Sequence, residues 1–354
     1  MERVLAIESS CDDTSVAIVR SDGYVEVNTM ASQEKEHAIF GGVVPEIASR
    51  NHSHNLLPLI EIALQKTNRT WGDIDGIAVT SQPGLIGSLL VGVVTAKTLG
   101  LTKSKDIIGV NHLEGHLLAP FLKDESYAPP EDFSYPYIGL AVSGGHSSLY
   151  YVRGLGDYDI LGSTVDDAAG EAFDKFAKLA GLGYPGGVEV DKYSKKGDPL
   201  KYSFPRGMMS RKKSPYQFSF SGLKTSGQKV LQSLSREEIR TEIHDLCASY
   251  QEAIVDALLT KLDWAVDEFF IQKNLAPKAV ITGGVSANSR LREKSKIWSE
   301  KKGIQLVIPP IRYCTDNAAM IGYAGIQRMN RGERSDLSLG ASPKSTIMEQ
   351  ACSQ

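Results

Sequence analysis

Two histidines stand four positions apart in the segment NHLEGHLLAP, residues 111–120, with an acidic residue between them. In a helix, His112 and His116 would project from the same face, because four residues make slightly more than one turn. Two imidazoles so placed can bind one metal ion. A structural interpretation also fits, with His112 as a polar helix cap and His116 in the core.

Glu114 would point largely to the other side of such a helix. Zinc peptidases place a glutamate directly after the first histidine, as in HExxH, or directly before the second, as in HxxEH. The order HLEGH does neither. The spacing therefore argues against a metallopeptidase, which remains an alternative.

A third candidate ligand lies about 200 residues later, in the segment RYCTDNAAMIGYAG. Asp316 opens a helix-like stretch there, directly after the strand pattern QLVIPP. Two histidines and one carboxylate with open coordination positions are common at iron(II) and zinc sites. Asp316 could instead cap the helix that follows it.

Three strand-to-turn junctions could bind an anion: ESSCDDT, VSGGHSS and ITGGVSAN. Glycine in VSGGHSS and ITGGVSAN lets the backbone N–H groups approach a phosphate closely, although each turn alone is also typical of a hairpin. A fourth glycine segment, LGYPGGVEVD, follows a helix that contains Asp174. The glycines there could simply end that helix, and Asp174 could form an ion pair with Lys178.

Residues 192–224 contain nine lysines and arginines and one acid, a local charge of +8 in a chain whose net charge is −3. Basic groups attract phosphate, and aromatic side chains can stack on unpaired bases of RNA. The stretch therefore predicts either a surface for single-stranded RNA or a solvated, mobile loop. Its interleaved aromatic residues are Tyr202, Phe204, Tyr216, Phe218 and Phe220.

The elements that must position these residues form two similar halves. VLAIESSCDDTSVAIV, near the start, and YIGLAVSGGHSSLYYV, residues 137–152, share one pattern of strand, polar turn and returning strand. Strand and helix patterns alternate after each copy. This weak repeat predicts a duplicated α/β fold with helices packed on a mostly parallel sheet in each half.

The proline-rich segment YAPPEDFSYP is the best candidate for the boundary between the halves. We expect an N-terminal lobe over residues 1–130, a C-terminal lobe over residues 137–330 and a partly flexible tail over residues 331–354. A ligand would lie in the cleft between the two lobes.

The composition of the 354 residues is that of an ordinary soluble protein, with 42% apolar and 23% charged residues. The four cysteines are far apart and form no CxxC pair, which favours a reducing compartment. The apolar segment GLIGSLLVGVVTAKTLGL is rich in glycine and contains Lys97, so we interpret it as a buried helix. We expect a cytoplasmic protein that does not bind membranes.

Six segments in this order resemble the universal tRNA threonylcarbamoyladenosine transferase subunit, in its bacterial and organellar form. They are HLEGHLLAP, AVSGGHSSL, DDAAGEAFDKFAKLAGLGYPGG, SFSGLKT, ITGGVSANSRLR and CTDNAAMIGYAG. The resemblance runs from AIESSCDDTSVAI to about Gly325. It implies the duplicated fold of actin, sugar kinases and heat-shock chaperones.

The same resemblance implies a function and a set of site residues. The family transfers a threonylcarbamoyl group from threonylcarbamoyl-adenylate to the exocyclic amine of the adenosine 3′ of the anticodon, in tRNAs that read codons beginning with A. By resemblance, His112, His116 and Asp316 bind one divalent metal, iron(II) or zinc. The residues that would contact the substrate are Ala141, Val142, Ser143, Gly144, Gly145, Asp174, Gly187, Asp191 and Asn288.

The resemblance assigns no catalytic nucleophile. It implies tRNA and the adenylate as ligands and, in a bacterial form, a paralogous partner of the same fold and a small ATPase. The fold alone would also permit an ATP-dependent kinase or a chaperone-like module. Such a protein would turn over ATP without an acyl-adenylate.

Overall fold

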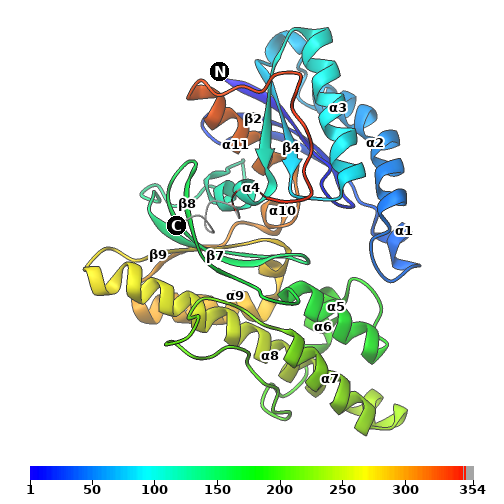
Figure 1. The fold of residues 1–354 in the computed structure, drawn as a ribbon, viewed down its shortest axis with the longest axis vertical. Helices are drawn as coiled ribbons and strands as arrows, with labels where there is room; N and C mark the ends of the chain where they lie inside the picture. Colours follow the sequence, from blue (N-terminus) through cyan, green and yellow to red (C-terminus); the bar gives the residue numbers. More distant parts are fainter. Residues whose placement is uncertain (346, 348–354) are drawn as a thin grey trace. The chain divides into compact units, whose positions relative to one another are not determined.

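The computed structural model describes residues 1–345 and 347, which divide into two compact α/β units (Figure 1). Unit 1 comprises Met1–Phe133, Leu155–Asp157 and the chain from Pro309 onward. Unit 2 comprises Ser134–Gly154 and Tyr158–Ile308. Each unit contains one five-stranded sheet with its own helices.

The sheet of unit 1 has the order β3-β2-β1-β4-β5. β1 pairs antiparallel with β2 and parallel with β4, and β5 extends the parallel part. The elements are β1 (Arg3–Glu8), β2 (Thr14–Arg20), β3 (Val25–Ala31), α1 (Glu34–Ala38), α2 (Pro45–Lys66), η1 (Trp71–Asp73), β4 (Gly76–Gln82), α3 (Ile86–Lys103), β5 (Asp106–Asn111), α4 (His112–Leu118), η2 (Ala119–Phe121), α10 (Ile311–Cys314) and α11 (Ala318–Asn330).

Alternate residues of β1 face opposite sides of this sheet, as the period of a strand requires. Leu5 and Ile7 belong to a buried cluster that includes Leu56 of α2 and Val93 of α3. On the other face, Ala6 lies so close to α11 that a Cβ on Gly322 would come within 3.1 Å of it. The sheet is therefore covered on both faces, which explains why β1 is apolar throughout.

Helix α11 is the main difference from the expected domain boundaries. Residues 309–330 were expected in the second lobe, but they group with unit 1. The reason is close packing on the first sheet: a Cβ on Gly325 would lie 2.4 Å from the side chain of Ala78 in β4. The first lobe is thus discontinuous in sequence, and its last helix follows the whole of unit 2.

The tail after α11 lies along β5, the edge strand of the first sheet. Ser335 forms an antiparallel bridge with Ile107, and Leu339 packs against the buried cluster of unit 1. The Ser342 N–H donates to the Ser81 carbonyl, and the Asn111 amide donates to the Ser345 hydroxyl, 2.7 Å away. The tail that we expected to be partly flexible also includes residues 346 and 348–354, which lie outside the described part of the chain.

Unit 2 repeats this topology, with the sheet order β10-β9-β6-β7-β8. β6 pairs antiparallel with β7 and parallel with β9, as β1 does with β2 and β4, so the predicted duplication is confirmed. The prediction of mostly parallel sheets is wrong, because both sheets mix parallel and antiparallel pairs. The elements are β6 (Tyr137–Val142), β7 (Ser147–Gly154), β8 (Asp157–Ser163), α5 (Ala169–Ala180), α6 (Gly186–Ser194), α7 (Ser221–Ser233), α8 (Arg236–Phe269), η3 (Ile271–Lys273), β9 (Lys278–Thr282), η4 (Gly284–Ala287), α9 (Ser289–Lys302) and β10 (Gln305–Val307).

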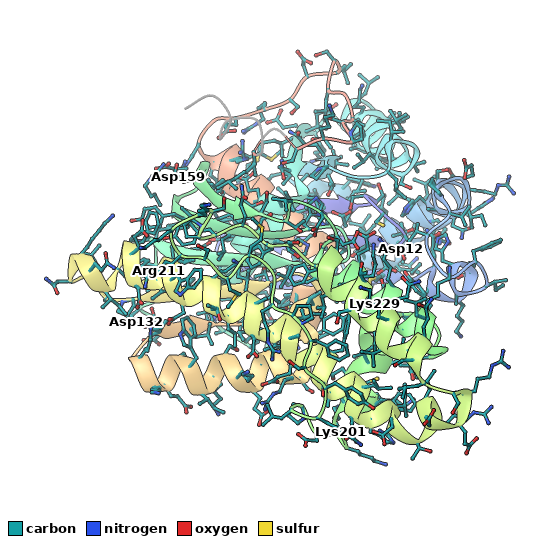
Figure 2. The ribbon with its side chains drawn as sticks, turned by 60° about the horizontal axis from the view of Figure 1, so that its bottom comes forward. Asp12, Asp132, Asp159, Lys201, Arg211 and Lys229 are labelled. Carbon is teal, nitrogen blue, oxygen red and sulfur yellow. The ribbon has the colours of Figure 1, made fainter. Side chains whose placement is uncertain are left out.

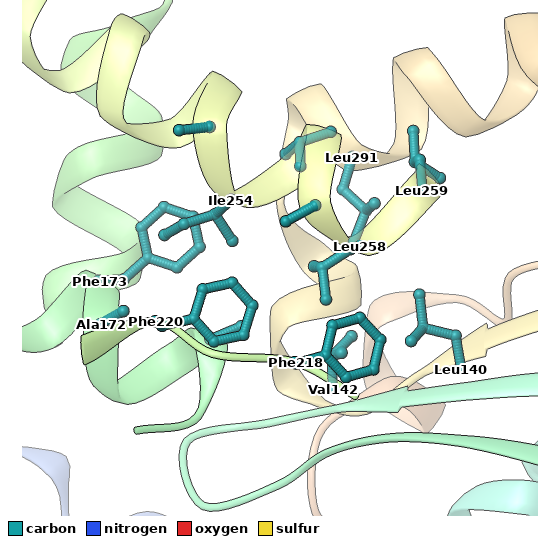
Figure 3. Packing of buried hydrophobic residues seen from close by; sticks show 14 of the residues in the cluster. Leu140, Val142, Ala172, Phe173, Phe218, Phe220, Ile254, Leu258, Leu259 and Leu291 are labelled. Carbon is teal, nitrogen blue, oxygen red and sulfur yellow. The ribbon is translucent and has the colours of Figure 1, made fainter. Parts of the chain in front are cut away.

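The core of unit 2 lies between its sheet and the long helix α8. Figure 3 shows Phe218 and Phe220 between the side chains of β6 and those of α8, including Leu258. Helix α8 begins with a capping box, in which the Ser235 hydroxyl accepts from the Glu238 N–H and the Glu238 carboxylate accepts from the Ser235 N–H.

Among the described residues, helix α3 is long and apolar enough to cross a membrane by length and composition. In this structure it packs on the first sheet, with Leu89, Val93 and Ala96 buried. The helix expected to be buried is therefore buried on one side only, because Ile86, Leu90, Val94 and Leu101 are exposed.

Candidate metal centre and glycine turns

Helix α4 presents the two histidines from the end of β5. The Asn111 side chain accepts a hydrogen bond from the Leu113 N–H, 2.9 Å away, and so caps the helix at its first turn. His112 and His116 are both buried, with ring centroids 4.7 Å apart. Because Asn111 fills the capping position, the interpretation of His112 as the cap is wrong.

The carboxylate of Asp316 lies beside both imidazoles. Its Oδ1 is 3.3 Å from Nε2 of His112 and 3.2 Å from Nε2 of His116. The helix cap considered for Asp316 is supplied by Asn317, whose side chain accepts from the Met320 N–H. The structure therefore brings together the three residues that the sequence suggested as metal ligands, from segments 200 positions apart.

The spacing of these three donors fits a divalent cation. Their candidate ligand atoms all lie within 4.8 Å of one another. Ligand atoms about 2.1 Å from one ion and 90–110° apart stand roughly 3.0–3.4 Å from each other, which matches the two Nε2–Oδ1 distances. In addition, both histidines direct Nε2 to the common point, as ligands of one ion must.

Glu8, at the end of β1, supports His112 from behind. Its Oε2 lies 3.0 Å from Nδ1 of His112 and accepts from the Thr80 hydroxyl, and its Oε1 accepts from the Ser10 N–H. A carboxylate on the second nitrogen of a metal-binding histidine fixes its tautomer and orientation. Nδ1 of His116, by contrast, is buried with no hydrogen-bond partner among the described residues.

The charges of this centre also suit a divalent cation. Burial lowers the pKa of His112, but the negative charges of Asp316 and Glu8 outweigh it and raise that pKa well above its ordinary value. Burial raises the pKa of Asp316, but the two histidines outweigh it and hold that pKa well below the usual range. Two carboxylate charges beside two imidazoles are the balance that one divalent ion would neutralise.

Glu114 faces away from the histidines, as its position predicts. Its carboxylate is fully buried and binds the guanidinium of Arg328 through two hydrogen bonds, 2.7 and 3.0 Å long. A carboxylate held in this way cannot act as the base of a metallopeptidase at the histidine pair.

In unit 2, the first glycine turn follows β6. The Ser143 N–H donates to the His146 carbonyl, and the Ser143 hydroxyl accepts from the His146 N–H. Gly144 and Gly145 are exposed, and a Cβ on either would meet nothing within 4 Å. The side chains of Ala141 and Val142 are buried in the sheet, so a ligand at this turn would meet backbone groups.

The turn after β9 packs directly against the first turn. Gly283 has a φ of +86°, and a Cβ there would lie 2.3 Å from the Val142 carbonyl oxygen. Glycine is required at this position for two reasons: other residues are strained at this φ, and any Cβ would collide with the backbone of Val142. Two of the three predicted turns therefore meet within unit 2, and the third, ESSCDDT, belongs to unit 1.

Asp174 holds the segment that begins helix α6. Its Oδ1 accepts from the N–H groups of Gly186 and Gly187, 2.8 and 3.3 Å away, which are different partners from the Lys178 considered from the sequence. Burial raises the pKa of Asp174, against the effect of these two N–H groups.

Asp191 and Asn288 meet at the start of α9. Oδ1 of Asp191 accepts from the Ser289 N–H and hydroxyl, while Asn288 caps the helix by accepting from the Leu291 N–H. The Asn288 amide also donates to Gln251 of α8, 2.6 Å away. Both candidate substrate residues thus have structural partners that sequence spacing does not reveal.

Four of the five aromatic residues named in the stretch 192–224 are buried, and Tyr202 is partly buried. Phe204, Tyr216, Phe218 and Phe220 are buried in the core of unit 2, so the expectation that they stack on RNA bases is wrong. Several of the cations, among them Lys201 and Arg211, which Figure 2 labels, pair with acids of α8. Lys201 pairs with Asp245, and Arg211 pairs with Asp267.

Comparison with known proteins agrees with the resemblance seen in the sequence. A family model described as tRNA N6-adenosine threonylcarbamoyltransferase matches residues 25–323. A protein of that name from Bdellovibrio bacteriovorus is 61% identical over 344 residues, covering 97% of this chain and 98% of the relative. One from Anaeromyxobacter dehalogenans is 48% identical over 346 residues, covering 97% and 99%.

A solved structure supports the fold. Component A of the (R)-2-hydroxyglutaryl-CoA dehydratase from Acidaminococcus fermentans superposes with a TM-score of 0.52 at 12% identity, covering 93% of this chain and 100% of that one. At this identity the likeness concerns the fold alone. The expected duplicated fold of the actin-like ATPases is confirmed.

Proposed function

Because this chain belongs to the family of tRNA N6-adenosine threonylcarbamoyltransferases, we propose that its donor substrate is threonylcarbamoyl-adenylate. The chain is an acyltransferase that transfers a threonylcarbamoyl group to an adenosine of tRNA. The observation that supports the chemistry most directly is the convergence of His112, His116 and Asp316 on one point.

The proposed reaction is a single acyl transfer. The exocyclic amine of the adenosine attacks the carbamoyl carbon, a new N–C bond forms, and the C–O bond to the phosphate breaks. AMP leaves with the electron pair of that bond, and the amine loses one proton. No covalent link to the protein is needed, because the adenylate is already an activated donor.

His112, His116 and Asp316 would hold the divalent metal, with iron(II) or zinc as the proposed ion. A bound divalent cation supplies Lewis-acid polarisation of an oxygen ligand. Glu8 would fix the ring of His112 for this task, and Asp316 would supply the negative charge that a cation requires. We propose that this centre holds the threonylcarbamoyl part of the donor.

The residues of unit 2 would hold the adenylate part. The exposed backbone of Gly144 and Gly145, in the turn that Ser143 begins, suits a phosphate, while Ala141 and Val142 fix the strand that leads to it. Asp174 has a second carboxylate oxygen, which could accept from ribose hydroxyls. The remaining proposed substrate residues are Gly187, Asp191 and Asn288.

The proposed acceptor is the adenosine 3′ of the anticodon, in tRNAs that read codons beginning with A. We propose a cytoplasmic location, where such tRNAs are found, and no binding to membranes. The packing of the apolar helix α3 on the sheet of unit 1 supports this.

We also propose a paralogous partner of the same fold and a small ATPase as members of an assembly. Helices α2 and α3 pack on each other and expose large apolar side chains, which suit a stable protein interface. These are Leu57, Ile62, Ile86, Leu90, Val94 and Leu101. Val94→Glu should weaken a co-purified complex with the partner, and an undiminished complex would contradict this surface.

The transfer itself is tested by nucleoside analysis of tRNA. The protein, loaded with iron(II) or zinc, is incubated with unmodified tRNA and threonylcarbamoyl-adenylate, alone and with each candidate partner. We expect threonylcarbamoyladenosine at the position 3′ of the anticodon and release of one AMP per modified nucleoside. ATP turnover without modified nucleoside would instead favour the kinase or chaperone alternative.

A further inference from the structure

The buried carboxylate of Glu114 has no place in the proposed chemistry, although it lies between the two histidines in sequence. It is fully buried, and Arg328 binds both of its oxygens: Nε donates to Oε2 over 2.7 Å and an Nη donates to Oε1 over 3.0 Å. Such two-point binding fixes both the distance and the rotation of the two groups.

The two partners belong to the two segments that carry the metal ligands. Helix α4 contains both histidines, and α11 begins two residues after Asp316. Arg328 lies in the last turn of α11, roughly 15 Å along the helix axis from its first residue. The pair therefore ties the far end of α11 to the middle of α4.

A second contact lies between the pair and the metal ligands. A Cβ added to Gly115 would come within 2.9 Å of the Ile321 side chain and 3.0 Å of the Met320 side chain. The absence of a side chain at Gly115 thus lets α4 and α11 lie against each other. The close contact at Gly115 and the ion pair of Glu114 with Arg328 hold α4 at two points. Helix α4 therefore has little freedom to slide or turn on α11.

Holding two helices together does not require charges. Replacing a buried ion pair by apolar side chains of similar size is often neutral or stabilising for a fold, whereas removing one partner is costly. What a guanidinium–carboxylate fork adds over an apolar contact is a defined orientation. That is the property needed to keep Oδ1 of Asp316 at 3.3 and 3.2 Å from the two histidine Nε2 atoms.

We propose that Glu114 and Arg328 are positioning residues of the metal centre, which set the placement of His112 and His116 relative to Asp316. This inference rests on the metal site of the proposed function. Their effect on the ligand atoms is transmitted by the packing of α4 on α11.

The test is cobalt(II) binding to the full-length protein, followed by visible absorption, which reports both the affinity and the geometry of the ligands. Two variants break the fork: Glu114→Gln, and Arg328→Lys, which keeps the positive charge. We expect each to lower cobalt affinity about tenfold and to change the absorption spectrum. The matched control is Glu333→Gln, which removes the exposed second partner of Arg328 and should leave affinity and spectrum unchanged.

A stability effect is separated by thermal unfolding of the metal-free proteins. The double variant Glu114→Leu with Arg328→Leu should regain much of the melting temperature lost by either leucine substitution alone, but not the cobalt affinity. Wild-type cobalt affinity and spectrum in Glu114→Gln and Arg328→Lys would overturn the proposal. So would a cobalt affinity restored by the double leucine variant together with its melting temperature.

These results are distinct from a failure of the metal site itself. If the wild-type protein binds no cobalt(II), iron(II) or zinc, the metal centre of the proposed function is wrong. If the wild type binds cobalt and the two fork variants bind it equally well, only the positioning role is wrong.

Discussion

The metal centre of unit 1 and the glycine turns of unit 2 are built in opposite ways. In unit 1, two buried histidines and the partly buried carboxylate of Asp316 point at one another, and Glu8 adds a further carboxylate. In unit 2, the turn after β6 offers backbone groups, while Asp174, Asp191 and Asn288 are bonded to the protein. We therefore expect substitutions in the centre of unit 1 to abolish function while the fold is kept. Substitutions around the glycine turns of unit 2 should damage both the fold and the function.

The largest effect should come from a metal ligand. His116→Ala removes one of three donor atoms, and because even indirect supports of metal ligands contribute 10–100-fold, we expect transfer to fall by more than about 100-fold. Metal content and the rate of tRNA modification measure this. His54→Ala, an exposed histidine in α2, is the control, and full activity in His116→Ala would contradict the metal assignment.

A strong effect on both fold and function should follow from Gly283→Ala in unit 2. The new Cβ would lie 2.3 Å from the Val142 carbonyl oxygen, at a φ of +86°, so we expect a loss of about 2 kcal/mol or more in the free energy of unfolding. Chemical denaturation measures the loss, and donor affinity should fall with it. The adjacent Gly284→Ala, where a Cβ meets nothing within 4 Å, should be nearly neutral; equal stability of the two variants would contradict the close packing of the turns.

Glu8→Gln tests whether the carboxylate beside His112 contributes to metal binding in unit 1. Glutamine can still accept from the Ser10 N–H, but it removes the negative charge beside Nδ1 of His112. We expect a 10–100-fold loss of metal affinity, measured by competition with a chelator of known affinity. Unchanged affinity would mean that the orientation of His112 is set elsewhere.

The smallest effect concerns pH and contrasts two carboxylates. Histidines hold the pKa of Asp316 low, whereas burial raises the pKa of Asp174. A raised pKa in the folded state means that Asp174 favours folding below its unfolded pKa, about 3.9, and that this contribution is lost as pH rises through the folded value.

Asp174→Asn keeps an oxygen that can accept from Gly186 and Gly187 but does not titrate. Compared with the wild type, its free energy of unfolding should fall less as pH rises above about 4, by on the order of 1 kcal/mol or less. Urea denaturation between pH 4 and pH 7 gives the difference. Parallel pH curves for the two proteins would show that Asp174 has no raised pKa.

Site residues could be predicted from the sequence where they lie within a few positions of one another. The spacing of His112 and His116 predicts one helix face, and the order of motifs relates them to Asp316. Glu8 was missed because its role depends on contact with a histidine 104 positions away. The available signal was an acid at the end of an apolar strand, a position where a buried carboxylate needs partners.

The basic stretch shows where local composition misleads. Tyr216, Phe218 and Phe220 alternate with Gln217 and Ser219, and this period of two is typical of a half-buried extended segment. The structure has that arrangement, since backbone hydrogen bonds join Phe218 to Ser163 and Val165. The excess of positive charge suggested that the stretch binds RNA, whereas the period of two already indicated that these aromatic side chains are buried in the core.

The placement of α11 could not be predicted from the order of elements, because the helix follows unit 2 in sequence but covers the sheet of unit 1. The glycines at 322 and 325 were visible as small residues on one side of a helix. Which sheet they approach depends on packing between segments more than 200 residues apart.

The late return of the chain to unit 1 has a consequence during protein synthesis. When His112 and His116 have left the ribosome, roughly two hundred residues must still be translated before Asp316 emerges, and α11 follows it. Until then the first sheet lacks one of its covering layers and the centre lacks its carboxylate. A nascent or prematurely terminated chain therefore holds only two of the three candidate ligands, so the proposed metal loading would belong to the finished polypeptide and would separate it from incomplete products.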